Sequence, residues 1–214
     1  MAILHPKPMN QLPPASAAKR EAIINAATQV FMSSGYGAAS MDQIAAEAGV
    51  SKQTVYSHFG AKDVLFEEIV SCKCTELMGE DGLQVGNGEE PAVMLYDTAK
   101  VFLHIVLTKE SITLYRTILS ECGRFPELAQ AFYRAGPKTA IQRLATYLDQ
   151  VNNQQLLEIP DSKAAAGMFF AMLRGDLFQQ CLLELRDMPD DAEIARTARW
   201  VADAFIQAHL PKKC

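Results

Sequence analysis

The stretch of sequence that decides the fold is residues 40–66, SMDQIAAEAGVSKQTVYSHFGAKDVLF. In its first part apolar residues recur at helical spacing, so that Met41 and Ile44 lie on one helical face. Ser40 precedes this run and can cap the helix, while Gly49 follows it, where a residue without a Cβ lets the chain turn. The pattern predicts two short helices joined by a tight turn and followed by a third helix.

The second short helix of this stretch, residues 52–58, is mostly polar. Ser51 offers another N-cap, and the helix has only Val55 as an apolar anchor, with Phe59 beyond it. A helix that buries one or two side chains and presents polar ones outward is suited to lie in the major groove of DNA. The sequence therefore predicts a helix-turn-helix DNA reader whose recognition helix is residues 52–58.

The order of features across residues 19–69 resembles the DNA-binding domain of the TetR family of transcriptional regulators. The matching features are an upstream helix with Ile23, Ile24, Ala27, Val30 and Phe31, then Gly35-Tyr36, the two short helices, Tyr56-Ser57-His58-Phe59, and Lys62-Asp63-Val64-Leu65-Phe66. Two residues depart from the family pattern. Gln53 stands where many relatives have a small residue, and it adds a side chain that can read a base. Ala61 stands where a capping Ser is common, which weakens the start of the next helix by about 1 kcal/mol.

The resemblance implies DNA contacts of two kinds. Gln53 can form a bidentate pair with adenine, and Lys52 can reach guanine acceptors or a nearby phosphate. Hydroxyls, a ring N–H and an ammonium stand at positions that match the family's phosphate contacts: Ser40, Thr54, Tyr56, His58 and Lys62. Ser51 is the remaining candidate contact. For Ser40 and Ser51, capping alone is an equally good interpretation.

Beyond residue 62 the sequence keeps helical periodicity and shows no alternating strand pattern. The predicted helices are residues 62–78, 90–107, 112–122, 126–135, 137–152, 162–185 and 190–209. With the three N-terminal helices they predict an all-α fold of about ten helices. The resemblance implies a three-helix DNA-binding domain at residues 16–62 and a larger helical effector-binding and dimerisation domain at 63–214, which leaves residues 1–15 as an N-terminal arm. Residues 124–128 and 132–133 add a weaker similarity to the AefR-like branch of C-terminal domains.

Charge is distributed unevenly along the 214 residues, whose formal net charge is −5. Residues 1–62 contain five Lys or Arg against three Asp or Glu, whereas the remainder contains 15 against 22. The weakly basic end is the one that carries the recognition helix. DNA binding is therefore expected to depend on a local patch and to show moderate sensitivity to salt.

The first 15 residues, MAILHPKPMNQLPPA, contain four prolines and no long apolar run. They predict a flexible arm, in which His5 and Lys7 either follow a minor groove or have no role. No later stretch reaches the roughly 18 uninterrupted apolar residues of a membrane span. The sequence therefore predicts a soluble, cytoplasmic protein without membrane contact.

The last two predicted helices have the composition of a subunit interface. Their apolar residues can either build a four-helix bundle with a second copy or fill the core of one copy: Met168, Phe169, Met172, Leu173, Leu177, Cys181, Leu185, Trp200, Phe205 and Ile206. A homodimer is expected because one recognition helix covers only a few base pairs, and useful specificity normally needs two half-sites.

A pocket for an apolar or aromatic effector is predicted in the C-terminal part. The candidates are Met94, Phe102, Leu114, Phe132, Met168, Phe169 and Met172, and simple core packing is the competing interpretation for each. Polar residues inside the predicted helices can orient a ligand: His104, Arg116, Arg174 and Asp176. For His104, a hydrogen-bonded or surface histidine is the simpler interpretation.

Five cysteines, an odd number, argue against a disulfide scaffold. Cys72 and Cys74 point in divergent directions on one helix, so we interpret them as free thiols. A redox or thiophilic-metal sensor that includes Cys122 or Cys181 is the alternative, and Cys214 is expected to be exposed. The sequence has no nucleophile elbow, glycine-rich phosphate loop, metal-ligand cluster or paired carboxylates, so neither an enzyme nor a metal or cofactor is expected.

The resemblance thus implies a sequence-specific regulator, most simply a ligand-responsive repressor that binds a palindromic double-stranded DNA operator as a dimer. In this hypothesis the helix at residues 62–78 connects the effector to the DNA reader. An activator of the same family is one alternative. A helical ligand carrier or interaction module that keeps the helix-turn-helix only as a scaffold is the other. The sequence names neither the target genes nor the effector.

Overall fold

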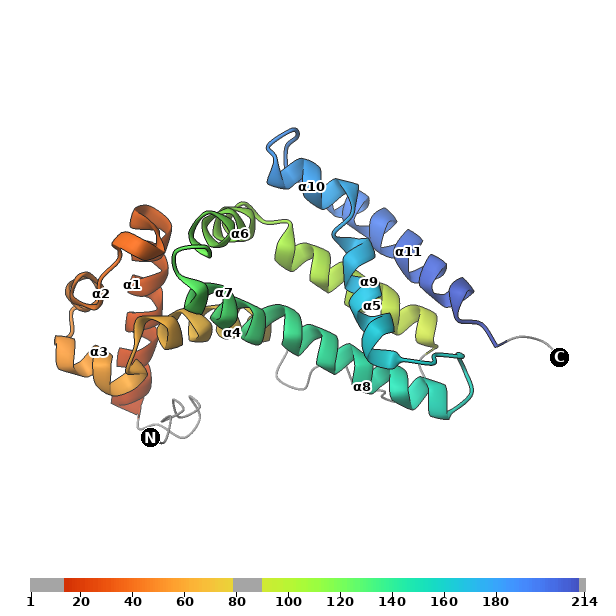
Figure 1. Ribbon diagram of the computed structural model, residues 1–214, viewed down its shortest axis with the longest axis horizontal. Coiled ribbons are helices and arrows are strands. Elements are labelled where there is room, and N and C mark those ends of the chain that lie inside the picture. The colour runs from red at the N-terminus through yellow and green to blue at the C-terminus, as the bar shows by residue number, and fades with distance from the viewer. Residues whose placement is uncertain (1–13, 79–89, 212–214) are drawn as a thin grey trace. The chain divides into compact units, whose positions relative to one another are not determined.

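The computed structural model describes residues 14–78 and 90–211, and every regular element in these ranges is a helix (Figure 1). The α-helices are α1 (Pro14–Ala38), α2 (Met41–Glu47), α3 (Lys52–Phe59), α4 (Lys62–Met78), α5 (Pro91–Val106), α6 (Lys109–Glu121), α7 (Pro126–Tyr133), α8 (Thr139–Asn153), α9 (Ser162–Leu173), α10 (Asp176–Leu182) and α11 (Asp191–Ala208). The all-α prediction is confirmed, and α4 has the predicted bounds. Most of the predicted arm, including His5 and Lys7, lies outside the described residues.

The predicted single helix over residues 162–185 is wrong, because the chain forms two helices there. α9 ends at Leu173, Gly175 has a ψ of −147°, and α10 begins at Asp176. Glycine in a helix interior is less stable than alanine by about 1 kcal/mol, so the chain leaves the helix here at little cost. α10 ends at Leu182, shortly before Glu184.

The sequence predicts a helix that starts at Pro137, but Pro137 lies inside a π-helical turn, Arg134–Lys138, that joins α7 to α8. Proline has no N–H to donate, and its ring clashes with the carbonyl four residues earlier in an α-helix. The wider π turn accommodates the ring without ending the helix. One helical segment therefore runs from Pro126 to Asn153.

Contacts divide the described chain into two compact units. The first groups residues 14–72 with 117–135, and the second groups residues 73–78 and 90–116 with 136–211. The end of α6 and all of α7 therefore belong with the N-terminal helices. Two helices, α4 and α6, belong partly to each unit.

The core of the first unit comes largely from α1 to α4. α1 supplies Ile23 and α3 supplies Val55, and both side chains are completely buried. Phe31, Tyr36 and Phe66 form an aromatic cluster with ring centroids 5.5–5.7 Å apart. This cluster fixes the end of α1 against α4, which supports the two short helices between them.

The core of the second unit comes mainly from α5, α8, α9 and α11. Leu95 of α5 and Leu148 of α8 are completely buried. Phe169 of α9 meets Phe205 of α11 edge to face, with ring centroids 5.3 Å apart. The apolar residues that recur at helical spacing in the C-terminal part thus include the residues that these helices bury in the core.

None of the helices within the described ranges is by itself long and apolar enough to cross a membrane. α5 and α6 meet the length and composition requirements only as a pair, which is bent by 70°.

Candidate nucleic-acid interface

The first helix of the pair, α2, is held at its start by Ser40. Its Oγ accepts a hydrogen bond from the backbone N–H of Gln43 (3.2 Å), and Gln43 Oε1 accepts one from the backbone N–H of Ser40 (2.9 Å). This reciprocal capping box satisfies two N–H groups at the helix start. Met41 and Ile44 of the same helix are buried, as their spacing predicts.

The turn between α2 and α3 depends on Gly49 and Ser51. Gly49 has a φ of 66°, in the left-handed region that residues with a Cβ rarely adopt. Ser51 caps α3, because its Oγ accepts a hydrogen bond from the backbone N–H of Thr54 at 3.1 Å. Both predicted caps are confirmed, while any contact of Ser40 or Ser51 with DNA stays a prediction.

The recognition helix α3 is anchored by two apolar side chains. Val55 is completely buried and Phe59 is 4% exposed. The remaining side chains are polar and either exposed or half-buried: Lys52, Gln53, Thr54, Tyr56, Ser57 and His58. The helix thus offers polar groups to solvent from a fixed support, which is what reading base edges requires.

Lys52 is paired with a carboxylate on the neighbouring helix. Its Nζ lies 2.8 Å from Asp42 Oδ1, and both side chains are exposed. The hydrogen bond to Asp42, together with the charge of that carboxylate, raises the pKa of Lys52. Asp42 therefore offsets positive charge that Lys52 would offer to a phosphate or a guanine.

Replacing Asp42 with Asn is expected to increase the affinity for operator DNA several-fold. The change frees the Lys52 ammonium and removes a negative charge that DNA phosphates would face. The dissociation constant, measured by fluorescence anisotropy at several salt concentrations, is the readout. Glu47→Gln, which neutralises another exposed carboxylate of α2, is the control. An unchanged dissociation constant for Asp42→Asn, or an equal gain for Glu47→Gln, would show that this ion pair does not limit binding.

Lys62, at the start of α4, is largely engaged inside the first unit. Its Nζ donates hydrogen bonds to the carbonyl oxygens of Tyr36 (2.7 Å) and Ala39 (3.0 Å), and it lies 4.2 Å from the centroid of the Tyr36 ring. Burial lowers the pKa of the Lys62 ammonium. An ammonium has three N–H donors, so one remains for a phosphate, and the DNA contact of Lys62 stays a prediction.

His58 lies near the end of α3, half-buried beside Phe59. Burial lowers the pKa of its imidazole, and the positive charges of Arg20 and Lys19 lower it further. His58 is therefore mostly neutral near pH 7, whereas a phosphate beside it would favour the protonated form.

Operator affinity is expected to rise as the pH falls from about 7.5 to about 5.5, because a phosphate at His58 raises its pKa and binding then takes up a proton. Folding responds in the opposite sense. The pKa of His58 is lower in the folded chain than in the unfolded chain, so the stability that neutral His58 contributes is present above pH 6.5 and lost below it. Dissociation constants measured across this range for the wild type and His58→Gln test the contact. Equal pH slopes for the two proteins would exclude it.

The end of α1 is supported by a contact from α6 that the sequence did not predict. The carboxylate of Glu121 accepts a hydrogen bond from the backbone N–H of Gly37 at 3.1 Å, and the Phe125 ring lies edge-on to Tyr36 at 5.6 Å between centroids. A Cβ on Gly37 would lie 2.8 Å from both Glu121 Oε2 and Phe125 Cε2, so any side chain at this position would displace these two groups. No local pattern marks the pair, because its members are 84 positions apart.

A second missed feature is a buried ion pair between α1 and α4. Arg20 Nη2 lies 2.5 Å from Glu68 Oε1, and the two side chains are 3% and 22% exposed. The guanidinium carbon of Arg20 lies 5.4 Å from the centroid of the Phe59 ring. Arg20 therefore links α1, α4 and the end of the recognition helix.

Five of the seven predicted effector-pocket residues are buried or half-buried: Met94, Phe102, Leu114, Phe132 and Phe169. Phe132 belongs to the first unit, whereas the other four belong to the second. Met168 and Met172 are 64% and 40% exposed. A pocket shared by these residues stays a prediction, and the exposure of the two methionines favours the competing role in a subunit interface.

Cys72 is half-buried on α4, where its Sγ lies 3.5 Å from Glu68 Oε1. Burial raises the pKa of its thiol, as does the charge of Glu68, and burial also raises the pKa of Cys181. Both shifts lower the thiolate fraction on which oxidation and metal binding depend, which favours the free-thiol interpretation. The side chains of Cys74 and Cys214 lie outside the described residues.

Two family models match the chain. Residues 23–69 match the model of bacterial regulatory proteins, tetR family. Residues 94–210, more than half of the chain, match the model of the AefR-like transcriptional repressor, C-terminal domain.

Two solved structures resemble nearly the whole chain. The Flavonoid-responsive Regulator FrrA is 35% identical, with 91% of this chain and 98% of that chain covered and a TM-score of 0.73. A TetR-family transcriptional regulator from Mesorhizobium loti MAFF303099 is 28% identical, with 93% and 100% covered and a TM-score of 0.70. The HTH-type transcriptional activator FasR of Mycolicibacterium smegmatis is 48% identical over 48 residues, 22% of each chain. The chain spans less than half the length of the curated relatives it matches.

Proposed function

This chain belongs to the TetR family of DNA-binding transcriptional regulators, and from that premise we propose that it is a homodimeric, ligand-responsive repressor. One observation carries the proposal: α3 presents Lys52 and Gln53 to solvent while Val55 and Phe59 anchor it in the core. A helix held in this way can enter a major groove and read base edges. The family consists of regulators rather than enzymes, so the proposed activity is binding alone.

Repression is the proposed sign of regulation. The family model that covers more than half of the chain describes a transcriptional repressor. The match to the activator FasR covers only 48 residues, so it bears on DNA binding and not on the sign. Expression of a reporter gene behind the operator, measured with and without the protein, decides between repressor and activator.

The proposed dimer forms through α9, α10 and α11. These helices and the turn after α10 expose large apolar side chains: Met168, Met172, Leu183, Leu185 and Trp200. Other apolar side chains of the same helices are buried in the unit's own core: Phe169, Leu173, Cys181 and Phe205. Burial of the exposed set against a second copy would be favourable, and a dimer would carry two recognition helices for two half-sites.

Trp200→Asp is expected to raise the dissociation constant of the dimer by at least about 100-fold, because it would place an unpaired charge in an apolar interface. Trp200 is 76% exposed in the single chain, so folding should be unaffected. Sedimentation velocity measures the change. Leu156→Asp, which alters another exposed apolar residue outside α9 to α11, is the control and should remain dimeric. A dimeric Trp200→Asp protein would contradict the proposed interface.

We propose that the effector binds in a domain at residues 63–214. Along the chain this domain follows an arm at residues 1–15 and a DNA-binding domain at residues 16–62. The description of FrrA as flavonoid-responsive supports an aromatic effector. α4 and α6 are the proposed connectors, because each belongs partly to both units and α6 ends at Glu121, which is bonded to Gly37. A ligand that lowers the affinity of the protein for the operator must itself bind the protein–operator complex less tightly than the free protein. A ligand that binds both forms equally would contradict ligand-induced release of the operator.

Selection of bound duplexes from a random DNA pool tests the proposed function. The purified protein at a fixed salt concentration is expected to enrich an inverted repeat with half-sites about one helical turn apart. Enrichment of a single half-site would support sequence-specific DNA binding but contradict the proposed dimer. No enrichment by a folded protein would instead favour the helical carrier or interaction module.

A further inference from the structure

Arg174 stands at the break between α9 and α10 and faces the core of the second unit. It is the C-cap of α9, immediately before Gly175. Its guanidinium carbon lies 5.4 Å from the centroid of the Phe102 ring, and Phe102 is only 6% exposed. The break in the helix therefore leaves a positive charge beside apolar core.

The guanidinium of Arg174 forms no ion pair or hydrogen bond with residues 15–72 or 90–211, and it lies over the ring of Phe102. Burial lowers the pKa of Arg174, and only Tyr115 acts in the opposite direction. A half-buried guanidinium without a carboxylate beside it is unfavourable, because the hydration that it loses is not replaced. Such a group is stabilised by any anion that reaches it.

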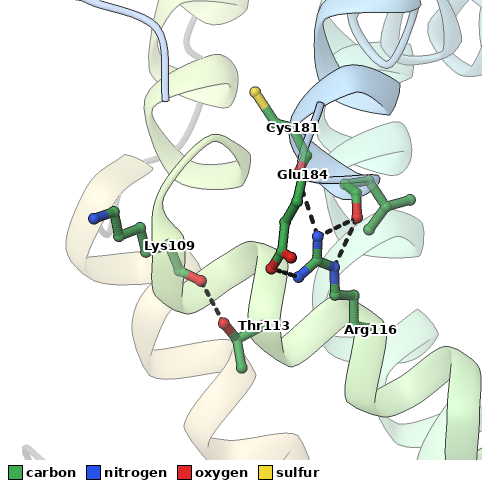
Figure 2. Close-up of polar contacts among 6 residues, drawn as sticks. Lys109, Thr113, Arg116, Cys181 and Glu184 are labelled. Carbon is green, nitrogen blue, oxygen red and sulfur yellow. Dashed lines mark hydrogen bonds and ion pairs between the residues drawn. The ribbon is translucent and has the colours of Figure 1, made fainter. Parts of the chain in front are cut away.

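Arg116, which lies near α10 in the same unit, shows the contrasting arrangement (Figure 2). Its Nε donates a hydrogen bond to the carbonyl oxygen of Leu182 at 2.7 Å, and its Nη1 forms an ion pair with Glu184. Figure 2 shows the guanidinium bonded on both sides, which leaves it no donor edge for a ligand. Arg116 therefore links α6 to α10 through hydrogen bonds and an ion pair, whereas no such bond holds Arg174 in the part of the chain that the structure describes.

Two pairs of packed aromatic rings include the two residues that interact with Arg174, Phe102 and Tyr115. Phe102 and Phe170 lie 4.8 Å apart between centroids, and Tyr115 meets Phe178 edge to face at 5.5 Å. A guanidinium binds a carboxylate through two parallel hydrogen bonds, and aromatic side chains favour a flat apolar body. The combination matches a small molecule with one aromatic system and one carboxylate.

We propose that Arg174 is the charge anchor of the effector site and that the effector is an aromatic carboxylate. This inference rests on the proposed ligand-responsive function and specifies its ligand class. The carboxylate binds the guanidinium of Arg174, and the aromatic body contacts the rings around Phe102. The anion supplies an ion-pair partner that the guanidinium lacks among the described side chains.

The test compares 2-naphthoate with its neutral isostere 2-naphthamide by isothermal titration calorimetry at pH 7.5 on the full chain without DNA. The wild type is expected to bind the anion at least about tenfold more tightly than the amide, since hydrogen bonds to charged groups are the stronger ones. Arg174→Met is expected to remove this preference, and Arg174→Lys to retain part of it. Arg199→Met is the matched control, because Arg199 is exposed and stacks on Tyr96 at 3.8 Å.

Equal affinities for the two probes, no binding of either, or a charge preference that survives in Arg174→Met would overturn the inference. The thermal midpoint without ligand gives a further readout. Removal of an unpaired, half-buried charge should not lower the midpoint, whereas replacement of a purely structural arginine would lower it. Naphthoate should raise the midpoint of the wild type but not that of Arg174→Met.

Operator release is measured separately, so that the two proposals can fail independently. If naphthoate binds through Arg174 but does not release operator DNA, the site stands and ligand-responsive repression fails. If only neutral aromatic compounds release the operator, repression stands and the role of Arg174 is refuted.

Discussion

A variant in which Lys52 and Gln53 are both alanine is expected to bind the selected operator about 100-fold more weakly, close to its affinity for unrelated DNA. Both side chains are exposed on the recognition helix. Each base contact of this kind discriminates by about 1–3 kcal/mol, and the two together supply most of the specificity that we propose for one half-site. The fold should be unaffected, because Val55 and Phe59 still anchor the helix.

The measurement is competition anisotropy with operator and scrambled duplexes at one salt concentration. Lys138→Ala combined with Gln150→Ala is the matched control, since it removes the same two residue types from exposed positions of the second unit outside α9 to α11. Its operator affinity should equal that of the wild type. Retention of operator selectivity by the Lys52 and Gln53 variant would contradict the recognition role of α3 and favour the carrier alternative.

Arg20→Leu is expected to lower the free energy of unfolding by about 3 kcal/mol, because it leaves the largely buried carboxylate of Glu68 without its partner. The loss should weaken operator binding as well, since Arg20 also lies against Phe59 of the recognition helix. Urea unfolding followed by circular dichroism measures the change. Lys19→Leu, an exposed neighbour on the same helix, is the control and should change stability little.

A double variant separates a broken ion pair from a packing defect. Arg20→Leu with Glu68→Leu removes both charges, and an apolar pair often replaces a buried ion pair without loss of stability. The double variant should therefore recover much of the stability lost in Arg20→Leu. If the losses of the two single variants simply add, the pair is not energetically coupled, and the attribution to a buried charge is wrong.

The recognition segment was predictable because its signals are local. Ser40 and Ser51 cap α2 and α3 through partners three residues away, and Val55 is buried as its spacing predicts. The bounds of α4 also agree with the prediction. Capping and helical periodicity act within about one turn of helix, so they can be read from a single sequence.

The interaction partners of the charged side chains were not predictable from the sequence. Lys62 matches a phosphate-contact position of the family, yet its ammonium is bonded to two carbonyls of a segment more than twenty residues earlier. Lys52 forms a hydrogen-bonded ion pair with Asp42, which lies ten residues earlier on the other side of the turn. Neither partner follows from periodicity, because tertiary packing decides which groups lie opposite a given side chain.

The sequence by itself determined the class of the protein. Local caps, the turn at Gly49 and the spacing of apolar residues specify an all-α chain with a helix-turn-helix, since these signals act between neighbours along the chain. Only the tertiary structure decided that Arg20 pairs with Glu68, that Glu121 supports Gly37 and that Arg174 lies over the ring of Phe102. Burial and hydrogen bonding between distant segments depend on which helices meet, and that information is spread over the whole chain.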